Sequence, residues 1–97
     1  MEVLIIATSK NFQSLPEDLR TQHSVLAIQA FQILQKMRDK ETLTGLRLLA
    51  SGGSMSIVIA QSIAHVFNEL QEYPLYPFFD WQIFPLGVHD IKFIEAA

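Results

Sequence analysis

The sequence predicts an α+β fold in which a four-stranded antiparallel sheet carries two helices on one face, the arrangement of a ferredoxin-like sandwich. Three observations support this prediction. Short β-prone runs alternate with longer segments of helical periodicity in the order β-α-β-β-α-β. A glycine pair separates the second run from the third, as in a hairpin. The 97 residues have the length of one domain, spanning 1–97, with no linker or repeat.

The N-terminal part of the chain contains the first strand and the first helix. Residues 3–7 form an apolar run that is typical of a strand. Pro16, Glu17 and Asp18 indicate a helix start, because proline suits the first turn and carboxylates suit the positive end of the helix dipole. Apolar residues then recur at helical spacing through residue 38. The residues expected on the core face are Leu19, His23, Leu26, Ala27, Ala30, Ile33, Leu34 and Met37.

The second half of the chain contains two strands, a helix and a fourth strand. Residues 43–50 and 54–60 are predicted as strands, and Gly52 and Gly53 between them supply the positive φ values of a tight hairpin. Ser62 is predicted to cap the second helix, which Pro74 and Pro77 end. Residues 80–86 form the last strand. The apolar positions expected on the second helix are Ile63, Val66, Phe67 and Leu70.

Polar residues indicate which strands lie at the edges of the sheet. Residues 3–7 and 56–60 are apolar on both faces, as expected for central strands. The second strand carries Arg47, and the fourth carries Asp80 and Gln82, as edge strands can. The first and third strands are therefore expected in the centre, with the second and fourth outside them.

The sheet face without helices requires a cover. A second copy of the chain, packed sheet against sheet, is the simplest candidate, so we expect a homodimer or a higher homo-oligomer. Val25, Ile28 and Phe31 support this expectation, because they lie off the core face of the first helix. Residues 88–97 form a tail that is a further candidate contact with a neighbouring subunit.

The composition excludes several classes of protein. A net charge of −3 argues against nucleic-acid binding, and the absence of cysteine excludes disulfides and thiolate chemistry. The apolar start is too short to span a membrane and lacks the features of a signal peptide, so a cytoplasmic protein without a membrane partner is expected. The histidine spacing shows no metal motif, and no G-x-G-x-x-G follows the first strand. We therefore expect neither a cofactor nor a metal.

One segment resembles a known family. Residues 73–86, YPLYPFFDWQIFPL, are similar to the "LPLFPYMDIEVTPL" signature of the muconolactone isomerase family, with the two prolines, the aspartate and the closing Pro-Leu in register. Residues 46–48 resemble the family's "LWRIAG" strand, and Ser56 falls on a serine of the following strand. The match covers residues 46–86 without a gap between Arg47 and Pro74.

This resemblance implies a ferredoxin-like fold of the dimeric α/β-barrel kind, which dimerises through its sheets and often forms larger rings. It implies cofactor-free movement of a double bond in a carboxylate-bearing lactone, by removal and return of a proton. The sequence departs from the family at residues 58–61, where the acidic "FDVD" is replaced by Val-Ile-Ala-Gln.

Two residues are the main candidates for chemistry. Arg47 is predicted to point to the helix-free face, where its guanidinium would clamp a carboxylate of a small ligand or form a salt bridge, for example with Asp80. His23 is predicted on the apolar face of the first helix, as an acid/base or as a hydrogen-bonded core histidine. A catalytic role requires His23 and Arg47 to open into one cavity.

The proline-rich turn supplies the other candidates. Asp80 is a general base if it is desolvated, or a hydrogen-bond acceptor for the turn. Tyr76 and Trp81 belong to an aromatic cluster that walls a small apolar pocket or packs at an interface. The predicted catalytic residues are therefore His23 and Asp80, and the predicted substrate-binding residues are Arg47, Ser56, Tyr76 and Trp81.

Three functions remain open at this point. The first is isomerisation of a small carboxylated ring compound by proton transfer. The second is a non-catalytic oligomeric module for small-ligand binding or assembly, which the departures at 58–61 favour. The third is a cofactor-free monooxygenase, which would show a deep cavity with convergent polar groups. Whether the protein is an enzyme is undecided among these.

Overall fold

The computed structural model describes residues 1–87. The tail 88–97, with its expected subunit contact, lies outside the described residues. The elements are β1 (Glu2–Ser9), α1 (Glu17–Asp39), β2 (Leu43–Leu48), β3 (Gly53–Ile59), α2 (Ile63–Glu72) and β4 (Phe79–Pro85). Short 3₁₀ helices, Phe12–Ser14 and Tyr76–Phe78, precede α1 and β4. The predicted element order is confirmed, and the predicted element bounds differ from these by only one or two residues.

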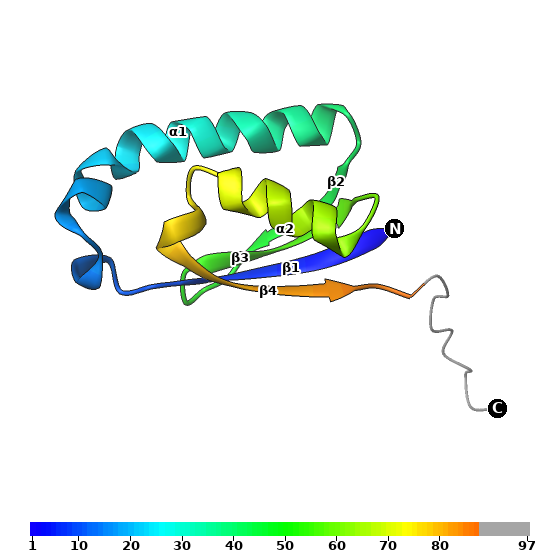
Figure 1. Ribbon diagram of the computed structural model, residues 1–97. Coiled ribbons are helices and arrows are strands. Elements are labelled where there is room, and N and C mark those ends of the chain that lie inside the picture. Colours follow the sequence, from blue (N-terminus) through cyan, green and yellow to red (C-terminus); the bar gives the residue numbers. More distant parts are fainter. Residues whose placement is uncertain (88–97) are drawn as a thin grey trace.

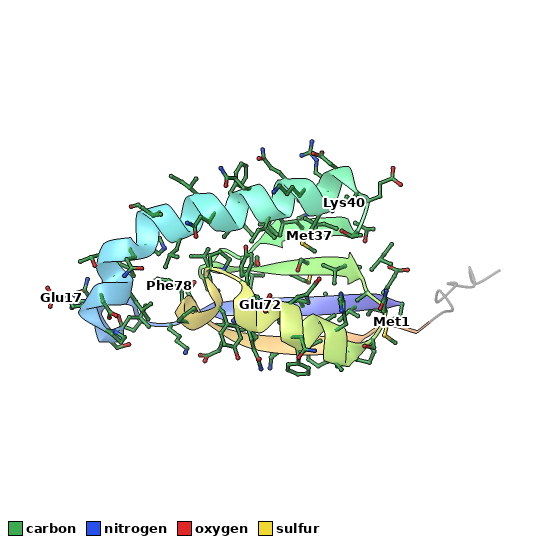
Figure 2. The ribbon with its side chains drawn as sticks, turned by 45° about the horizontal axis from the view of Figure 1, so that its top comes forward. Met1, Glu17, Met37, Lys40, Glu72 and Phe78 are labelled. Atoms are coloured by element: carbon green, nitrogen blue, oxygen red, sulfur yellow. The ribbon has the colours of Figure 1, made fainter. Side chains whose placement is uncertain are left out.

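The four strands form one antiparallel sheet in the order β2-β3-β1-β4. The central strands are β1 and β3, as the polar residues predicted. Figure 1 shows both helices on the same side of the sheet. In Figure 2 the top of the molecule is turned toward the viewer. There α1 lies beside β2, and α2 lies over the other half of the sheet. This is the ferredoxin-like arrangement expected from the sequence.

The register of the central strands determines which side chains face the helices. Val3 lies opposite Val58, and Ala7 lies opposite Ser54. Val3 is fully buried, and alternation along the strand places every second residue on the same face. The core on this face consists of Val3, Ile5, Leu43, Val58, Val66 and Leu70.

The two helices follow their apolar patterns with two exceptions. Ile33 was expected on the core face of α1, but its side chain is 37% exposed. On α1, Ala30 is buried, and Val25, Ile28 and Phe31 are more than half exposed, as the helical spacing predicted. On α2, the Ser62 hydroxyl accepts a hydrogen bond from the His65 amide at 3.1 Å, which confirms the predicted cap. Phe67 was expected on the core face of α2, but its side chain is 51% exposed. Val66 and Leu70 fill the space against the sheet, so Phe67 lies on the flank of the helix.

A bulge in β2 changes the face of one residue. Simple alternation along β2 would place Leu43 on the helix-free face together with Arg47. The register shifts between Leu43 and Gly45, and Leu43 turns into the helix-side core while Arg47 stays opposite Met55. A bulge of this kind adds a residue to one strand and reverses the alternation beyond it.

The hairpin between β2 and β3 requires its glycines. Gly52 and Gly53 have φ values of +90° and +104°, a region that residues with a Cβ rarely adopt. A Cβ on Gly53 would also collide with the carbonyl oxygen of Ala7 on the neighbouring strand.

We therefore expect Gly53→Ala to lower the free energy of unfolding by about 2–3 kcal/mol, because backbone strain at one such residue costs on the order of 1–3 kcal/mol. Urea unfolding followed by circular dichroism measures the change. Gly87→Ala is the matched control, since no atom lies within 4 Å of a Cβ added there. Equal stability of the two variants would contradict the role assigned to Gly53.

Candidate functional site

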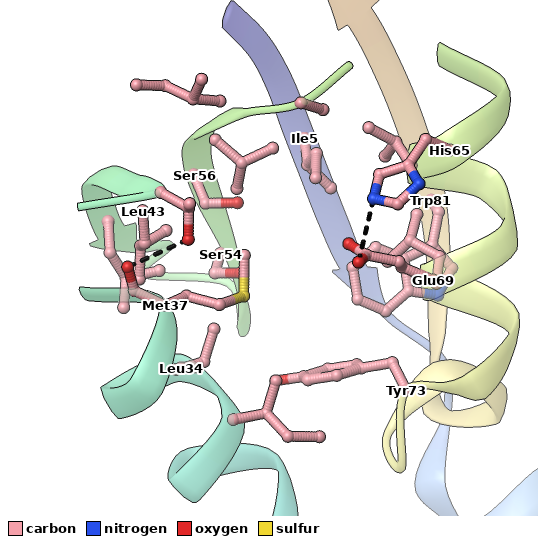
Figure 3. Close-up of a pocket in the computed structure, with 18 of the residues that line it drawn as sticks. Ile5, Leu34, Met37, Leu43, Ser54, Ser56, His65, Glu69, Tyr73 and Trp81 are labelled. Carbon is pink, nitrogen blue, oxygen red and sulfur yellow. Dashed lines mark hydrogen bonds and ion pairs between the residues drawn. The ribbon is translucent and has the colours of Figure 1, made fainter. Parts of the chain in front are cut away.

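The main cavity lies between the two helices and the sheet, on the helix side. Its volume is about 530 Å³. Its walls come from the second half of α1, from α2, and from all four strands or the residues that flank them. Figure 3 shows β3 and the end of α1 on one side of the cavity and α2 on the other. The apolar lining residues are Ile5, Ile33, Leu34, Met37, Leu43, Leu46, Val58, Ile59, Ala60, Val66, Leu70 and Trp81.

Small side chains on the sheet leave this space open. Ser54 and Ser56 on β3 and Ala60 just after it face the helices at positions where larger apolar residues would fill the core. Protein interiors are otherwise packed densely, so a space of this size between sheet and helices indicates a binding site.

A histidine and a carboxylate project from α2 at the mouth of the cavity. The Nε2 atom of His65 and the Oε1 atom of Glu69 are 3.1 Å apart, and both residues line the cavity. They are four residues apart on the helix, so both lie on the same face. Their side chains are 45% and 63% exposed, which leaves the pair in contact with solvent and with any ligand. Figure 3 shows the pair across the cavity from Ser54 and Ser56.

Aromatic side chains close one end of the cavity. Tyr73 and Trp81 pack edge to face with ring centroids 6.0 Å apart, and both line the cavity. The indole N–H of Trp81 donates to the carbonyl oxygen of Tyr76 at 3.0 Å, which holds the ring in place. Burial raises the pKa of the Tyr73 hydroxyl above its ordinary value, because a tyrosinate loses hydration there.

The remaining charges around the cavity are Lys40, at the end of α1, and Glu72, at the end of α2. Both side chains are exposed. Lys40 is the one Lys or Arg among the lining residues within 1–87. The cavity therefore has an apolar interior and a mouth with charges of both signs.

Two predicted substrate-binding residues, Ser56 and Trp81, line this cavity. Arg47 does not, because its position opposite Met55 places it on the helix-free face. Within the described residues, the main cavity therefore lies on the helix side of the sheet and not on the helix-free face, where a cleft was expected. No sequence pattern reveals this, since the helix-side cavity results from the packing of α1 and α2.

Arg47 and Asp80 also lie too far apart for a pair within one chain. Arg47 is on β2 and Asp80 is on β4, at opposite edges of the sheet. Three interstrand spacings separate them, or about 14 Å. The salt bridge suggested by the sequence cannot form within one chain.

His23 lies in an aromatic cluster instead of the cavity. Its ring packs edge to face against Phe12 and Phe78, at centroid distances of 5.4 and 5.0 Å. It is a half-buried residue of the first part of α1 and lines neither of the two hollows described. The expected common cavity of His23 and Arg47 is therefore absent from residues 1–87.

Tyr76 and Asp80 line a smaller hollow of about 230 Å³ on the outer side of Trp81. Lys10 and Phe79 form other parts of its wall. Trp81 and Leu70 line both this hollow and the main cavity. Three predicted site residues thus meet here, and two, Ser56 and Trp81, meet in the main cavity.

Sequence reasoning missed His65, Glu69, Tyr73 and Ser54. His65 is exposed, and it lies at the mouth of the cavity. The separation of His65 and Glu69 by four residues was a detectable signal, because it places both on one helix face. Within residues 1–87 no group of three or more His, Cys, Asp or Glu side chains is placed to hold a metal ion. In the same residues, no helix is long and apolar enough to cross a membrane.

The fold and cavity define a ferredoxin-like α+β domain with an open site between sheet and helices. Among solved structures, the chain is similar to muconolactone isomerase, with a TM-score of 0.74, 17% sequence identity, and coverage of 99% of this chain and 98% of that one. It is also similar to 5-chloro-2-hydroxyhydroquinone dehydrochlorinase from Burkholderia phenoliruptrix in complex with 2,5-dihydroxybenzoquinone. For the dehydrochlorinase the TM-score is 0.62 and the sequence identity is 19%, with coverage of 90% of this chain and 94% of that one.

The likeness inferred from residues 46–86 is therefore confirmed at the level of the fold, and it extends over nearly the whole chain. No family model matches the sequence, and no curated protein matches it either.

The raised pKa of Tyr73 gives a direct test of the packing at the closed end of the cavity. The chain has two tyrosines, so Tyr76→Phe leaves Tyr73 alone. We expect the ultraviolet absorbance of this variant to report ionisation at a pH above the ordinary value of 10.0. The folded pKa is raised, so Tyr73 does not change stability below pH 10 and lowers it as the pH rises further.

The same variant unfolded in urea is the control, because its tyrosine should return to the ordinary pKa. Ionisation of the folded variant at or below that value would show that Tyr73 is not desolvated.

Proposed function

We propose that the protein binds a small ring compound in the helix-side cavity and moves a proton between two carbon atoms of that ring, as an isomerase. The observation that carries this proposal is the His65–Glu69 pair at the mouth of an otherwise apolar cavity. The fold shared with muconolactone isomerase supports the same class of reaction. The acid/base assigned here is His65, in place of the His23 expected from the sequence.

The pair has the chemistry that this reaction requires. A neutral imidazole can accept a proton, and a carboxylate beside it orients the ring. A proton removed from one ring carbon would be held by the pair and returned to another carbon as the double bond shifts. Atoms and electrons balance without a further reactant.

The apolar walls contribute to the same step. Leu34, Val58 and Leu70 present no polar atoms to the ring, so the space around it is less polar than water. A less polar surrounding strengthens the interaction between the developing charge on the ring and the His65–Glu69 pair.

His65→Gln and Glu69→Gln test the assignment. With cyclohexane-1,4-dione in deuterated water, proton removal is detected by NMR as deuterium uptake into the ring. We expect His65→Gln to lower the enzyme-dependent exchange rate by about a hundredfold or more, the range found for general acid–base groups. Glu69→Gln should have a smaller effect, since Glu69 orients the imidazole of His65 but does not itself remove the proton from the ring.

Glu17→Gln is the matched control, because Glu17 lies at the start of α1 and does not line the cavity. His23→Gln distinguishes the two histidines. Loss of exchange in His23→Gln, with His65→Gln unaffected, would overturn the proposal.

Ligand binding without catalysis is the second candidate. The exposure of His65 and Glu69 favours it, because an imidazole and a carboxylate that remain hydrated are weaker catalysts. In that case a small ring compound binds, and no exchange above the rate in buffer is detected in the native protein.

We also propose that the helix-free face joins two copies of the chain. Its central part is apolar, with Leu4 and Ile6 on β1, Met55 and Ile57 on β3, and Phe84 on β4. Arg47 and Asp80 lie at opposite edges of this face, so they are placed to pair between two copies although they cannot pair within one.

Light scattering at micromolar concentration measures the mass directly. We expect a dimer or a larger assembly for the native chain, and a shift toward monomer for Ile57→Glu, because a buried unpaired carboxylate is costly. Phe67→Glu is the control, since Phe67 is an exposed apolar residue on α2, away from this face. A monomeric native chain would contradict the proposed dimer.

A further inference from the structure

Two serine side chains face the cavity from the centre of the sheet. Ser54 and Ser56 lie on β3 opposite Ala7 and Ile5 of β1, on the face that otherwise forms the apolar core. Both are half-buried and line the cavity. Neither hydroxyl has a hydrogen-bond partner among residues 1–87, and neither oxygen is buried without one, so both are accessible from the cavity. Their hydrogen-bonding capacity is directed to whatever occupies the cavity.

The spacing of the two serines restricts what they would bind. Residues i and i+2 of a strand point to the same side and are separated by about 6.7 Å. This distance is comparable with the separation of two oxygen atoms at opposite corners of a six-membered ring, after allowance for the length and tilt of the hydrogen bonds. A hydroxyl both donates and accepts, so each serine would bind either a carbonyl or a hydroxyl oxygen.

The charges around the cavity argue against an anionic ligand. Lys40 faces two carboxylates, Glu69 and Glu72, so the lining residues carry one more negative than positive charge while His65 is neutral. Arg47, the carboxylate anchor expected from the sequence, lies on the other face of the sheet. A carboxylated ring would therefore be repelled from the mouth more than an uncharged one.

We infer that the ligand of this cavity is an uncharged six-membered ring with oxygen substituents at opposite ends, and that Ser54 and Ser56 bind one oxygen each. The inference rests on the proposed function only in placing the ligand in the same cavity. It adds the class of the ligand and the residues that select it. The apolar walls would hold the ring edges, and Tyr73 and Trp81 would close the aromatic end.

Equilibrium binding to simple ring compounds tests the inference without any turnover. Isothermal titration calorimetry with hydroquinone, kept reduced, is the main measurement. Phenol has one oxygen, catechol has two adjacent oxygens, and benzoate carries a charge. We expect hydroquinone to bind most tightly of the four and benzoate least.

Single substitutions then assign the two oxygens. Ser54→Ala and Ser56→Ala should each weaken hydroquinone binding by about fivefold, the loss of one hydrogen bond of about 1 kcal/mol. Phenol binding should respond to only one of them. Ser51→Ala is the matched control, since Ser51 is exposed in the hairpin loop and does not line the cavity. Thermal unfolding of each variant shows that the fold is retained.

Hydroquinone affinity that is unchanged in both alanine variants would overturn the inference, as would tighter binding of benzoate or the absence of binding by every probe. These outcomes are separate from those of the proposed function. If His65→Gln loses exchange and neither serine variant changes hydroquinone binding, the proposed function is supported and the inference is overturned. If the serine variants weaken hydroquinone binding and His65→Gln keeps its exchange rate, the inference is supported and the proposed function is overturned.

Discussion

The antiparallel register of β1 with its two neighbours is the constraint on which the rest of the structure depends. Val3 lies between Val58 and Pro85, and Ala7 lies between Ser54 and Trp81. Side chains alternate between the two faces of a strand, so a shift of one residue in β3 would turn both serines away from the helices. The burial of Val58 on β3 opposes such a shift, because the shift would turn Val58 out of the core. The same contacts that stabilise the sheet therefore position the cavity residues.

The apolar side chains are divided between the two faces of the sheet, and these faces have different properties. The helix-side core is small, and it surrounds a cavity that serines leave open. A fully packed core would be more stable, and the open cavity is the kind of feature for which proteins accept lower stability when it binds a ligand. The opposite face carries apolar side chains with no helix above them, which accounts for a charged content of only 18% in so short a chain. The low fraction of charged residues is thus explained by the strands that form this helix-free face.

Much of the fold was predictable because its signals are local. Strand and helix periods, the Ser62 cap and the Gly52–Gly53 hairpin all lie within a few residues of the structure that they specify. The errors also have local causes. The bulge between Leu43 and Gly45 reverses the alternation without a sequence signal, and Phe67 is apolar but lies beyond the width of sheet that α2 covers. Of the residues predicted for the site, Ser56 and Trp81 line the cavity, whereas Arg47 and His23 do not.

The sequence by itself determined the order of the elements, the central position of β1 and β3, and the helix-free apolar face. The physical reason is that hydrophobic periodicity and edge polarity are properties of short segments. Only the tertiary structure decided where the cavity lies and which residues share it. The two serines of β3, Ser54 and Ser56, face the His65–Glu69 pair of α2 across the cavity. This space exists because α1 and α2 pack apart over small residues. Such a meeting depends on the packing of several elements at once, and no single segment of the sequence contains it.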